Sequence, residues 1–132
     1  MMGEAHMTIA LWCVLAAALL PYLGIGVAKL GGPMPARANA NPREWVEALT
    51  GFRKRGRWYE ANAYEAFPPF AAAVIIAQML HAPQNRLDEL ALAFIAFRVA
   101  HFVCYVADLA AVRTAVWFGG MACVVALFFA AP

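Results

Sequence analysis

Four stretches of this 132-residue chain are apolar and long enough to cross a lipid bilayer, which restricts its possible folds more than any other feature. A membrane-spanning helix needs about 20 predominantly apolar residues. We expect spans at approximately residues 7–29, 58–80, 88–108 and 113–131, in a single membrane domain covering residues 1–132. Hydrophobic residues make up 64% of the chain and charged residues only 14%, against about 25% charged in soluble domains. The expected fold class is all-α, an integral membrane four-helix bundle.

Basic residues are concentrated in the first loop, at approximately residues 30–57. Seven of the ten Lys and Arg side chains lie there or at its edge: Lys29, Arg37, Arg43, Arg53, Lys54, Arg55 and Arg57. The positive-inside rule therefore places this loop in the cytoplasm. Attraction to anionic lipid headgroups explains the basic cluster without a nucleic-acid partner.

The three cysteines, Cys13, Cys104 and Cys123, lie in apolar segments without metal-ligand spacing. We interpret them as small buried hydrophobic residues, and we expect no metal.

Local signals predict where helices bend, begin or approach one another. Pro21 predicts a kink in the first span, and Asn41 before Pro42 predicts the start of a short interfacial helix. Asn85 is the expected N-cap of the third span. Gly119-Gly120 predicts close helix packing in the fourth span.

Two polar patterns interrupt the apolar segments, namely Asn62-x-x-Glu65 and Arg98-x-x-His101-x-x-x-Tyr105. A charged side chain at membrane depth costs roughly 2.5–3.5 kcal/mol on insertion scales, so such residues face a bundle interior, pair with one another or mark a site. Residues at these spacings share one face of a helix. Each pattern therefore forms a polar stripe on its own span.

The two stripes are expected to meet the start of the fourth span, Arg113-Thr114, on the cytoplasmic side of the membrane. The spans alternate in direction, so the beginning of the second, the end of the third and the beginning of the fourth reach the same depth. We expect one pocket in this half of the membrane, formed by Asn62, Glu65, His101, Tyr105 and Arg113.

Each of these residues also has a purely structural interpretation. Arg98 and Glu65 form a buried ion pair in one such interpretation, which fixes helix register rather than binding a ligand. His101 is then a neutral histidine bonded to a carbonyl, Tyr105 an interfacial aromatic residue, and Arg113 a membrane anchor.

The chemistry of the expected pocket suits a thiol peptide and an apolar electrophile. Arginine and lysine bind carboxylates, and a buried glutamate binds an ammonium group. A nearby arginine or tyrosine donor lowers the pKa of a thiol from about 8.5 and enriches the thiolate. A site between helices also admits lipophilic substrates from the bilayer.

At these residues the chain resembles the MAPEG superfamily, the membrane-associated proteins in eicosanoid and glutathione metabolism. The resemblance covers nearly the whole chain and is nearest to the short bacterial members, which implies a multi-pass protein of a bacterial inner membrane. The matching segments are Glu60-Ala-Asn62-Ala-Tyr-Glu65-Ala-Phe-Pro68-Pro69-Phe70-Ala, Arg98-Val-Ala-His101-Phe-Val-Cys-Tyr105, and Arg113-Thr114.

The resemblance implies a homotrimer with glutathione, the co-substrate, bound between adjacent subunits. It implies that Arg113 is the catalytic residue, which stabilises the thiolate. The glutathione-binding residues that it implies are Asn62, Glu65, Arg98, His101, Tyr105, Arg57 and Thr114. The chain departs from the family pattern four residues before Asn62, where Trp58 replaces the usual arginine and Arg57 is one position out of register.

Three classes of function follow. The first is a glutathione-dependent membrane enzyme of transferase or peroxidase type, acting on lipophilic electrophiles or lipid peroxides. The second is a non-enzymatic MAPEG-like protein, whose buried polar residues hold the trimer or bind lipid. The third, a proton-coupled transporter, is disfavoured because the first span contains no embedded acidic residue.

Overall fold

The structure, a computed structural model, describes residues 5–30, 32 and 34–132, and every regular element in them is helical. The elements in chain order are α1 (Ile9–Leu19), α2 (Pro21–Ala28), a short 3-10 helix (Ala36–Ala40), α3 (Pro42–Glu47), α4 (Gly51–Met79), α5 (Gln84–Val106) and α6 (Ala110–Phe128).

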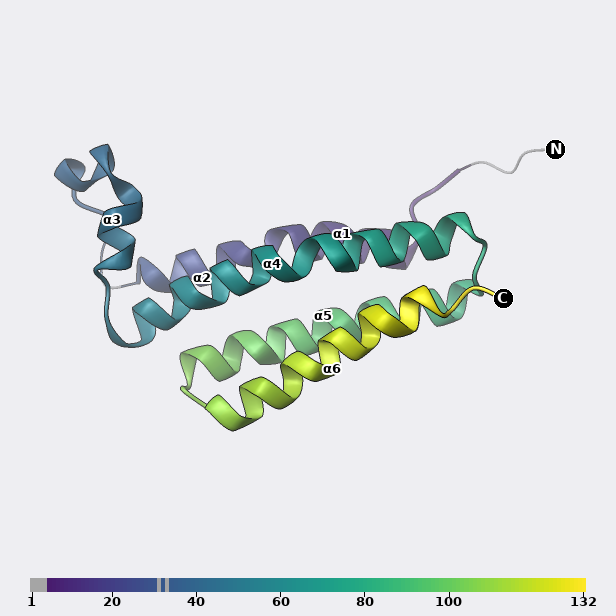
Figure 1. The fold of residues 1–132 in the computed structure, drawn as a ribbon. Helices are drawn as coiled ribbons and strands as arrows, with labels where there is room; N and C mark the ends of the chain where they lie inside the picture. The colour runs from purple at the N-terminus through teal and green to yellow at the C-terminus, as the bar shows by residue number, and fades with distance from the viewer. Residues whose placement is uncertain (1–4, 31, 33) are drawn as a thin grey trace.

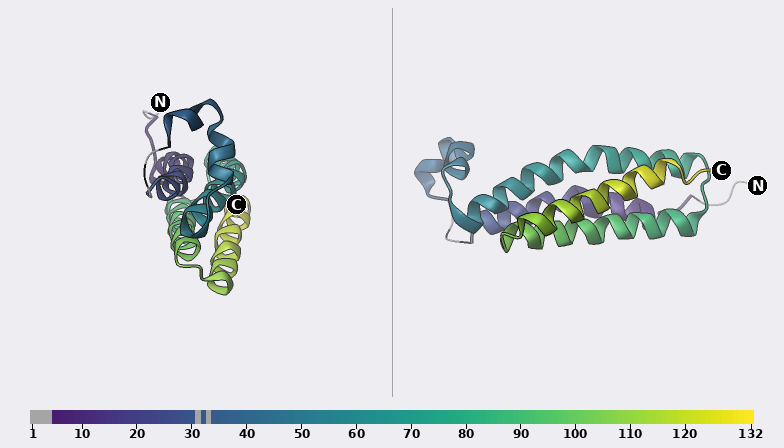
Figure 2. Two further views of the ribbon diagram at one scale, coloured as in Figure 1. Left: turned by 90° about the vertical axis from the view of Figure 1, so that its left-hand side faces the viewer. Right: turned by 60° about the horizontal axis from the view of Figure 1, so that its bottom comes forward.

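The long helices lie side by side, and each runs antiparallel to the one before it (Figures 1 and 2). α1 and α2 form one interrupted rod that packs against α4, and α5 and α6 pack against each other and against α4. The start of α1 and the end of α6 lie at one end of the molecule, whereas α3 and the turn between α5 and α6 lie at the other. This alternation brings the first half of α4 level with the end of α5 and the start of α6.

Among the described residues, three segments are long and apolar enough to cross a membrane: Ile9–Ala28, Gln84–Val106 and Ala110–Phe128, with 20, 23 and 19 residues. The expected span at 58–80 lies in α4, which is not among these segments; its apolar second half is preceded by the polar residues Asn62 and Glu65. At 29 residues α4 is about 43 Å long, well beyond the ~30 Å of a hydrocarbon core. The membrane boundaries of this helix stay a prediction.

The helix boundaries confirm two local predictions and correct one. The first rod breaks between Leu19 and Pro21, and α3 starts at Pro42 directly after Asn41. Asn85 is not an N-cap, because α5 already begins at Gln84, with Pro83 in the capping position.

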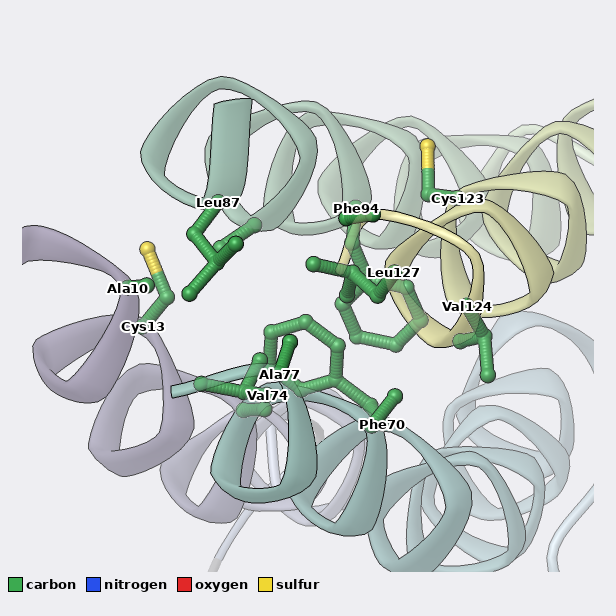
Figure 3. Close-up of a cluster of buried hydrophobic side chains, with 14 of the residues drawn as sticks. Ala10, Cys13, Phe70, Val74, Ala77, Leu87, Phe94, Cys123, Val124 and Leu127 are labelled. Atoms are coloured by element: carbon green, nitrogen blue, oxygen red, sulfur yellow. The ribbon is translucent and has the colours of Figure 1, made fainter. Parts of the chain in front are cut away.

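A layer of apolar side chains fills the interior where α1, α4, α5 and α6 meet (Figure 3). At its centre the rings of Phe70 and Phe94 stack, with centroids 3.9 Å apart and planes 8° from parallel. Small residues around them let the helices approach closely. Cys13, Cys104 and Cys123 are buried free thiols, as expected.

Two glycine contacts set the distances between helices. A Cβ atom on Gly56 of α4 would lie 2.6 Å from the carbonyl oxygen of Gly24 in α2. A Cβ atom on Gly119 of α6 would lie 2.6 Å from Cζ of Phe97 in α5, so the close packing predicted there is confirmed. Both contacts fix the register of neighbouring helices, and hence the level at which their polar residues meet.

Candidate functional site

A buried hydrogen bond between α5 and α4 forms the base of the candidate site. The Arg98 guanidinium donates from Nη1 to Oδ1 of Asn62 over 2.8 Å, and Arg98 is only 3% exposed. The guanidinium carbon lies 5.5 Å from the ring centroid of Tyr59, which is fully buried, and the Tyr59 hydroxyl donates to the backbone oxygen of Arg98 over 3.3 Å. The Arg98 guanidinium therefore contacts two side chains of α4, Asn62 and Tyr59.

This hydrogen bond also fixes the orientation of the Asn62 amide. A guanidinium has only donors, so the atom of Asn62 that faces it must be the amide oxygen. The amide nitrogen, with its two N–H donors, is then directed away from Arg98. Asn62 thus offers donors to an acceptor that enters from its other side.

Two buried nitrogen atoms beside Asn62 have no hydrogen-bond partner among the described residues. They are Nη2 of Arg98 and Nδ1 of His101, and His101 is only 2% exposed. Buried polar atoms in proteins are nearly always hydrogen-bonded, so such atoms need an explanation. A polar ligand or an ordered water at this level provides one.

Arg113 reaches the site from the first turn of α6. Its guanidinium carbon lies 4.8 Å from the ring centroid of Tyr105. The Tyr105 ring in turn meets His101 edge-on, with centroids 4.9 Å apart and planes at 87°. No ion pair of Arg113 occurs within the part of the chain that the structure describes. Its charge is therefore available to an anion.

An open pocket of about 160 Å³ lies where these groups converge. Its lining consists of Asn62, His101, Tyr105, Arg113, Thr114 and Trp117. Five of the eight residues predicted for the site line this pocket, and Arg98 adjoins it through Asn62. The Thr114 hydroxyl donates to the backbone oxygen of Ala110 over 3.2 Å, so its lone pairs remain to accept a hydrogen bond.

Glu65 lies beside this pocket rather than in it. It lines an adjoining hollow of about 130 Å³, which shares Asn62 and Trp117 with the first and is otherwise apolar. The Arg98–Glu65 ion pair considered from the sequence is not formed, because Arg98 is level with Asn62 and Glu65 is exposed one turn further along α4.

Arg57 lies away from the pocket, on another side of α4. Five residues along a helix correspond to a rotation of about 140° at 3.6 residues per turn, so Arg57 and Asn62 cannot share a face. Arg57 pairs with Glu47 of α3 at 3.3 Å and lines a different hollow. Trp58, four residues before Asn62, is half exposed at 51%.

Several residues around the site were not singled out from the sequence. Tyr59 packs against the rings of His101, Phe102 and Tyr105. Its position three residues before Asn62, on the same face of the helix, could have identified it from the sequence. Trp117 lines both hollows and lies three residues after Thr114.

The basic cluster has a structural role that the sequence did not indicate. Arg55 donates to the backbone oxygens of Tyr105 and Val106, at 2.7 and 3.2 Å, and so caps the end of α5. Arg53 donates to the backbone oxygen of Ala28 over 2.8 Å at the end of α2. A cation at a helix C-terminus satisfies free carbonyls and interacts favourably with the helix dipole.

The pocket combines one guanidinium, one amide, one hydroxyl and three aromatic side chains. Guanidinium and amide groups are hydrogen-bond donors of the kind that anions require. Across residues 5–30, 32 and 34–132, no group of three or more His, Cys, Asp or Glu side chains is arranged to hold a metal ion.

Comparisons with known proteins identify a family for the chain but no individual relative. No curated protein and no solved structure matches the chain. The family model described as "MAPEG family" matches residues 9–131, which is essentially the whole chain. Together with the three helices that are able to cross a membrane, this match shows that the chain is a membrane protein that belongs to the MAPEG family.

Proposed function

We propose that this protein is a glutathione-dependent membrane enzyme, which transfers glutathione to lipophilic electrophiles or reduces lipid peroxides. The observation that carries the proposal is the convergence of Asn62, His101, Tyr105 and Arg113 on one open pocket. Family membership supports the same conclusion. The proposed setting is a bacterial inner membrane, with the basic loop between α2 and α4 in the cytoplasm.

In the proposed mechanism Arg113 is the catalytic residue. Its guanidinium favours the thiolate form of glutathione by lowering the pKa of the thiol. The thiol proton passes to water, and the thiolate sulfur then forms a bond to the electrophilic atom of the second substrate as the bond from that atom to its leaving group breaks and the leaving group departs with the electron pair. With a lipid peroxide the sulfur would instead take the outer oxygen as the O–O bond breaks. The lipid alcohol then leaves, and a second glutathione converts the sulfenic acid to the disulfide and water. Asn62 contributes amide donors, and Tyr105 holds the Arg113 guanidinium against its ring face.

Glutathione is expected to bind between subunits of a homotrimer built from four-helix bundles. A pocket of about 160 Å³ is smaller than the ~300–1,000 Å³ of sites that enclose small-molecule ligands. A second copy of the chain would supply the remaining wall. Large exposed apolar side chains on α1, among them Trp12, Leu15 and Leu19, support such an assembly or contact with lipid.

The hollow beside the pocket suits an apolar second substrate. Ala66, Pro69 and Met121 form its apolar lining, and it adjoins the pocket at Asn62 and Trp117. Glu65 at its edge is exposed and remains available to the ammonium group of glutathione. The two substrates would then meet near Trp117.

One observation favours a second candidate, a non-enzymatic protein that binds lipid or is held together by its polar residues. Trp58 occupies the position four residues before Asn62, on nearly the same face of α4, where family enzymes carry arginine. The Arg98–Asn62 hydrogen bond is by itself sufficient as a structural contact between helices. This candidate predicts no thiolate chemistry.

The deciding experiment is ultraviolet difference absorbance of glutathione bound to the detergent-purified protein. We expect a thiolate band with the wild type, a weaker band with Arg113→Lys and none with Arg113→Ala. Arg86→Ala is the matched control, because Arg86 is an exposed arginine in the first turn of α5. The start of α5 lies at the opposite end of the bundle from the turn between α5 and α6 (Figure 1). Saturable binding without a thiolate band in the wild type would favour the non-enzymatic candidate. A band unchanged in Arg113→Ala would remove Arg113 from the mechanism.

A further inference from the structure

A chain of hydrogen bonds ties the start of α1 to the turn between α4 and α5, at the end of the molecule opposite α3 (Figure 1). The Thr8 hydroxyl donates to Oε1 of Gln78 over 3.0 Å, and Nε2 of Gln78 donates to Oε1 of Gln84 over 2.7 Å. Nε2 of Gln84 then donates to Oδ1 of Asp88 over 2.8 Å, and the same oxygen accepts the backbone N–H of Ala10 over 2.9 Å. We call Thr8, Gln78, Gln84 and Asp88 the α1 latch.

The hydrogen bonds between the side chains of the α1 latch all run toward Asp88. A carboxylate has only acceptors, so Gln84 must present its amide nitrogen to Asp88 and its amide oxygen to Gln78. The same rule orients Gln78 and makes the Thr8 hydroxyl a donor. The Thr8 oxygen in turn accepts the N–H of Leu11 over 3.2 Å. The latch therefore satisfies two of the free N–H groups in the first turn of α1, and it places a carboxylate at the positive end of the helix dipole.

Apart from the latch, α1 has no large side chain that is fully buried in the bundle. Its buried residues are all small, namely Ala10, Cys13 and Ala17, and two of them lie at the edge of the apolar layer (Figure 3). Its larger apolar residues Trp12 and Leu19 are about half exposed, at 55% and 54%. Lipid tails are as apolar as these side chains, so close packing and hydrogen bonds between helices decide how helices associate in a membrane. The latch therefore supplies a large share of the attachment of α1.

The other end of α1 is a point where the rod formed by α1 and α2 can bend. Pro21 has no N–H to donate to the carbonyl oxygen of Ala17, so one helical hydrogen bond is missing there. Beyond this break α2 is held firmly, because Gly24 packs directly against Gly56 of α4. α1 is thus a half-helix with a weak joint at one end and the latch at the other.

A closed gap lies behind this joint, between the rod, α4 and α5. Ala17 and Leu20 line it from the rod, and Phe94 and Arg98 line it from α5. The remaining lining residues come from α4 and are Ala63, Ala66 and Phe67. The gap has no room for a water molecule while α1 is in place. It extends from the apolar layer at Phe94 to Arg98 at the base of the candidate site, so a displacement of α1 would connect the bilayer with that base.

We propose that α1 is a latched half-helix, which swings about Pro21 when the latch opens and admits an apolar molecule from the bilayer to the gap. The two hydrogen bonds that the start of α1 makes to α4 and α5 lie at the end farthest from the joint, where they resist a swing most effectively. The molecule is apolar because every lining residue of the gap except Arg98 is apolar. No latch residue lines the pocket around Asn62, so the proposal does not depend on glutathione binding.

The test uses cysteine side chains as reporters in protein reconstituted into lipid nanodiscs. Cys13 lies on the buried face of α1 and is 5% exposed, and Cys123 of α6, 7% exposed, is the internal control. Ala17→Cys combined with Cys13→Ala places a reporter in the gap itself. The measured quantity is the rate of labelling by N-phenylmaleimide, an apolar reagent that partitions into the bilayer, followed by mass spectrometry of peptides.

Thr8→Val and Gln84→Leu each break the latch but retain the Asp88 carboxylate, so the charge that acts on the Cys13 thiol is unchanged. We expect each variant to label Cys13 and the Ala17→Cys reporter about tenfold faster than the wild type, because the loss of one hydrogen bond shifts an opening equilibrium by about that factor. The rate at Cys123 should stay the same.

Asn85→Leu is the matched control for Gln84→Leu, because Asn85 is an exposed neighbour outside the latch, and it should label as the wild type does. A sulfonated maleimide of similar size, which stays in water, should label the Ala17→Cys reporter no faster in the latch variants. Circular dichroism of each variant checks that it is folded.

Four results would overturn the proposal. Unchanged labelling of Cys13 in both Thr8→Val and Gln84→Leu would show that the latch does not hold α1. Equal acceleration at Cys123 would show a general loosening of the bundle. Acceleration at Cys13 without acceleration at the Ala17→Cys reporter would show fraying of the first turns of α1 in place of a swing. Equal acceleration with the sulfonated reagent would show that the gap opens to water and not to the bilayer.

Discussion

Arg98 donates a hydrogen bond to Oδ1 of Asn62 over 2.8 Å, and this bond determines which end of the Asn62 amide faces the candidate site. Arg98 thus positions Asn62, and an effect of Arg98 on a ligand can pass through that amide. The hydrogen bond joins α4 to α5 at the level where Arg113 arrives from α6. A change at Arg98 should therefore alter ligand binding through the Asn62 amide, besides removing the unpartnered Nη2 atom of Arg98 from the site.

We predict that Arg98→Leu weakens glutathione binding about tenfold, because the Asn62 amide is no longer fixed and its buried oxygen loses a donor. Arg98→Lys, which retains a donor, should restore part of the affinity. Calorimetric titration of Arg98→Leu, Asn62→Ala and the double variant measures the coupling. We expect the double variant to lose no more than the more severe single variant. Strictly additive losses would show that the two residues act separately.

The second prediction concerns the pH dependence of thiolate formation. The pKa of bound glutathione should lie below its usual range because the Arg113 guanidinium favours the anion. Removing this charge in Arg113→Gln should raise the pKa by about one unit or more, so that the thiolate band appears only at higher pH. A spectrophotometric pH titration measures the shift. An identical titration curve for Arg113→Gln would contradict a role for this charge.

The third prediction concerns the contact between α2 and α4. Gly56→Ala should lower the free energy of unfolding by about 1–3 kcal/mol, because the added Cβ atom overlaps the carbonyl oxygen of Gly24 and crowds Cβ of Val27, which lies 3.0 Å away. Gly26→Ala is the matched control, since nothing lies within 4 Å of its added Cβ atom. We expect this control to be neutral or stabilising by about 0.4–1 kcal/mol. Thermal unfolding in detergent compares them, and equal stabilities would argue against the close contact.

The fourth prediction concerns the cap that Arg55 provides. Arg55→Gln should loosen the end of α5, because the backbone oxygens of Tyr105 and Val106 lose their charged donor. Hydrogen exchange of the amides around residues 105–109 should become faster, and glutathione affinity should fall because Tyr105 supports Arg113. Arg86→Gln again serves as the control. Unchanged exchange in this segment would show that the cap is not needed.

The fifth prediction concerns α3, which is held to α4 by Glu47. Lys54 donates to the Glu47 carboxylate at 3.1 Å, and Arg57 lies 3.3 Å from it. The hydrogen bond from Lys54 lowers the pKa of Glu47 below its usual value of 4.5. A carboxyl group whose pKa is lower in the folded state stabilises that state above its unfolded pKa. This stabilisation is lost as the pH falls through the folded pKa.

Attachment of α3 should therefore be intact at neutral pH and weaken below about pH 4.5. Limited proteolysis of the segment 36–50 across this pH range, with an acid-tolerant protease, measures the change. Glu47→Gln should be equally susceptible at both ends of the range. If cleavage of the wild type did not depend on pH, the two ion pairs would contribute nothing to the attachment.

Local periodicity was enough to predict much of the candidate site. Asn62 and Glu65, like Arg98 and His101, lie on one helix at fixed spacings, and the pitch of an α-helix determines their common face from covalent geometry alone. The break at Pro21 was likewise predictable, since proline has no N–H to donate. The length and apolarity of the segments indicated helices able to cross a membrane.

The sequence by itself determined an all-helical membrane chain of the MAPEG family, with polar stripes on the helices that form its pocket. Only the tertiary structure decided that Arg98 bonds to Asn62 rather than to Glu65, that Arg55 caps α5, and that Arg57 lines a different hollow. The physical reason is that pairing between helices depends on their relative register and rotation. Contacts distant in sequence set that register, such as Gly24 against Gly56 and Phe70 against Phe94.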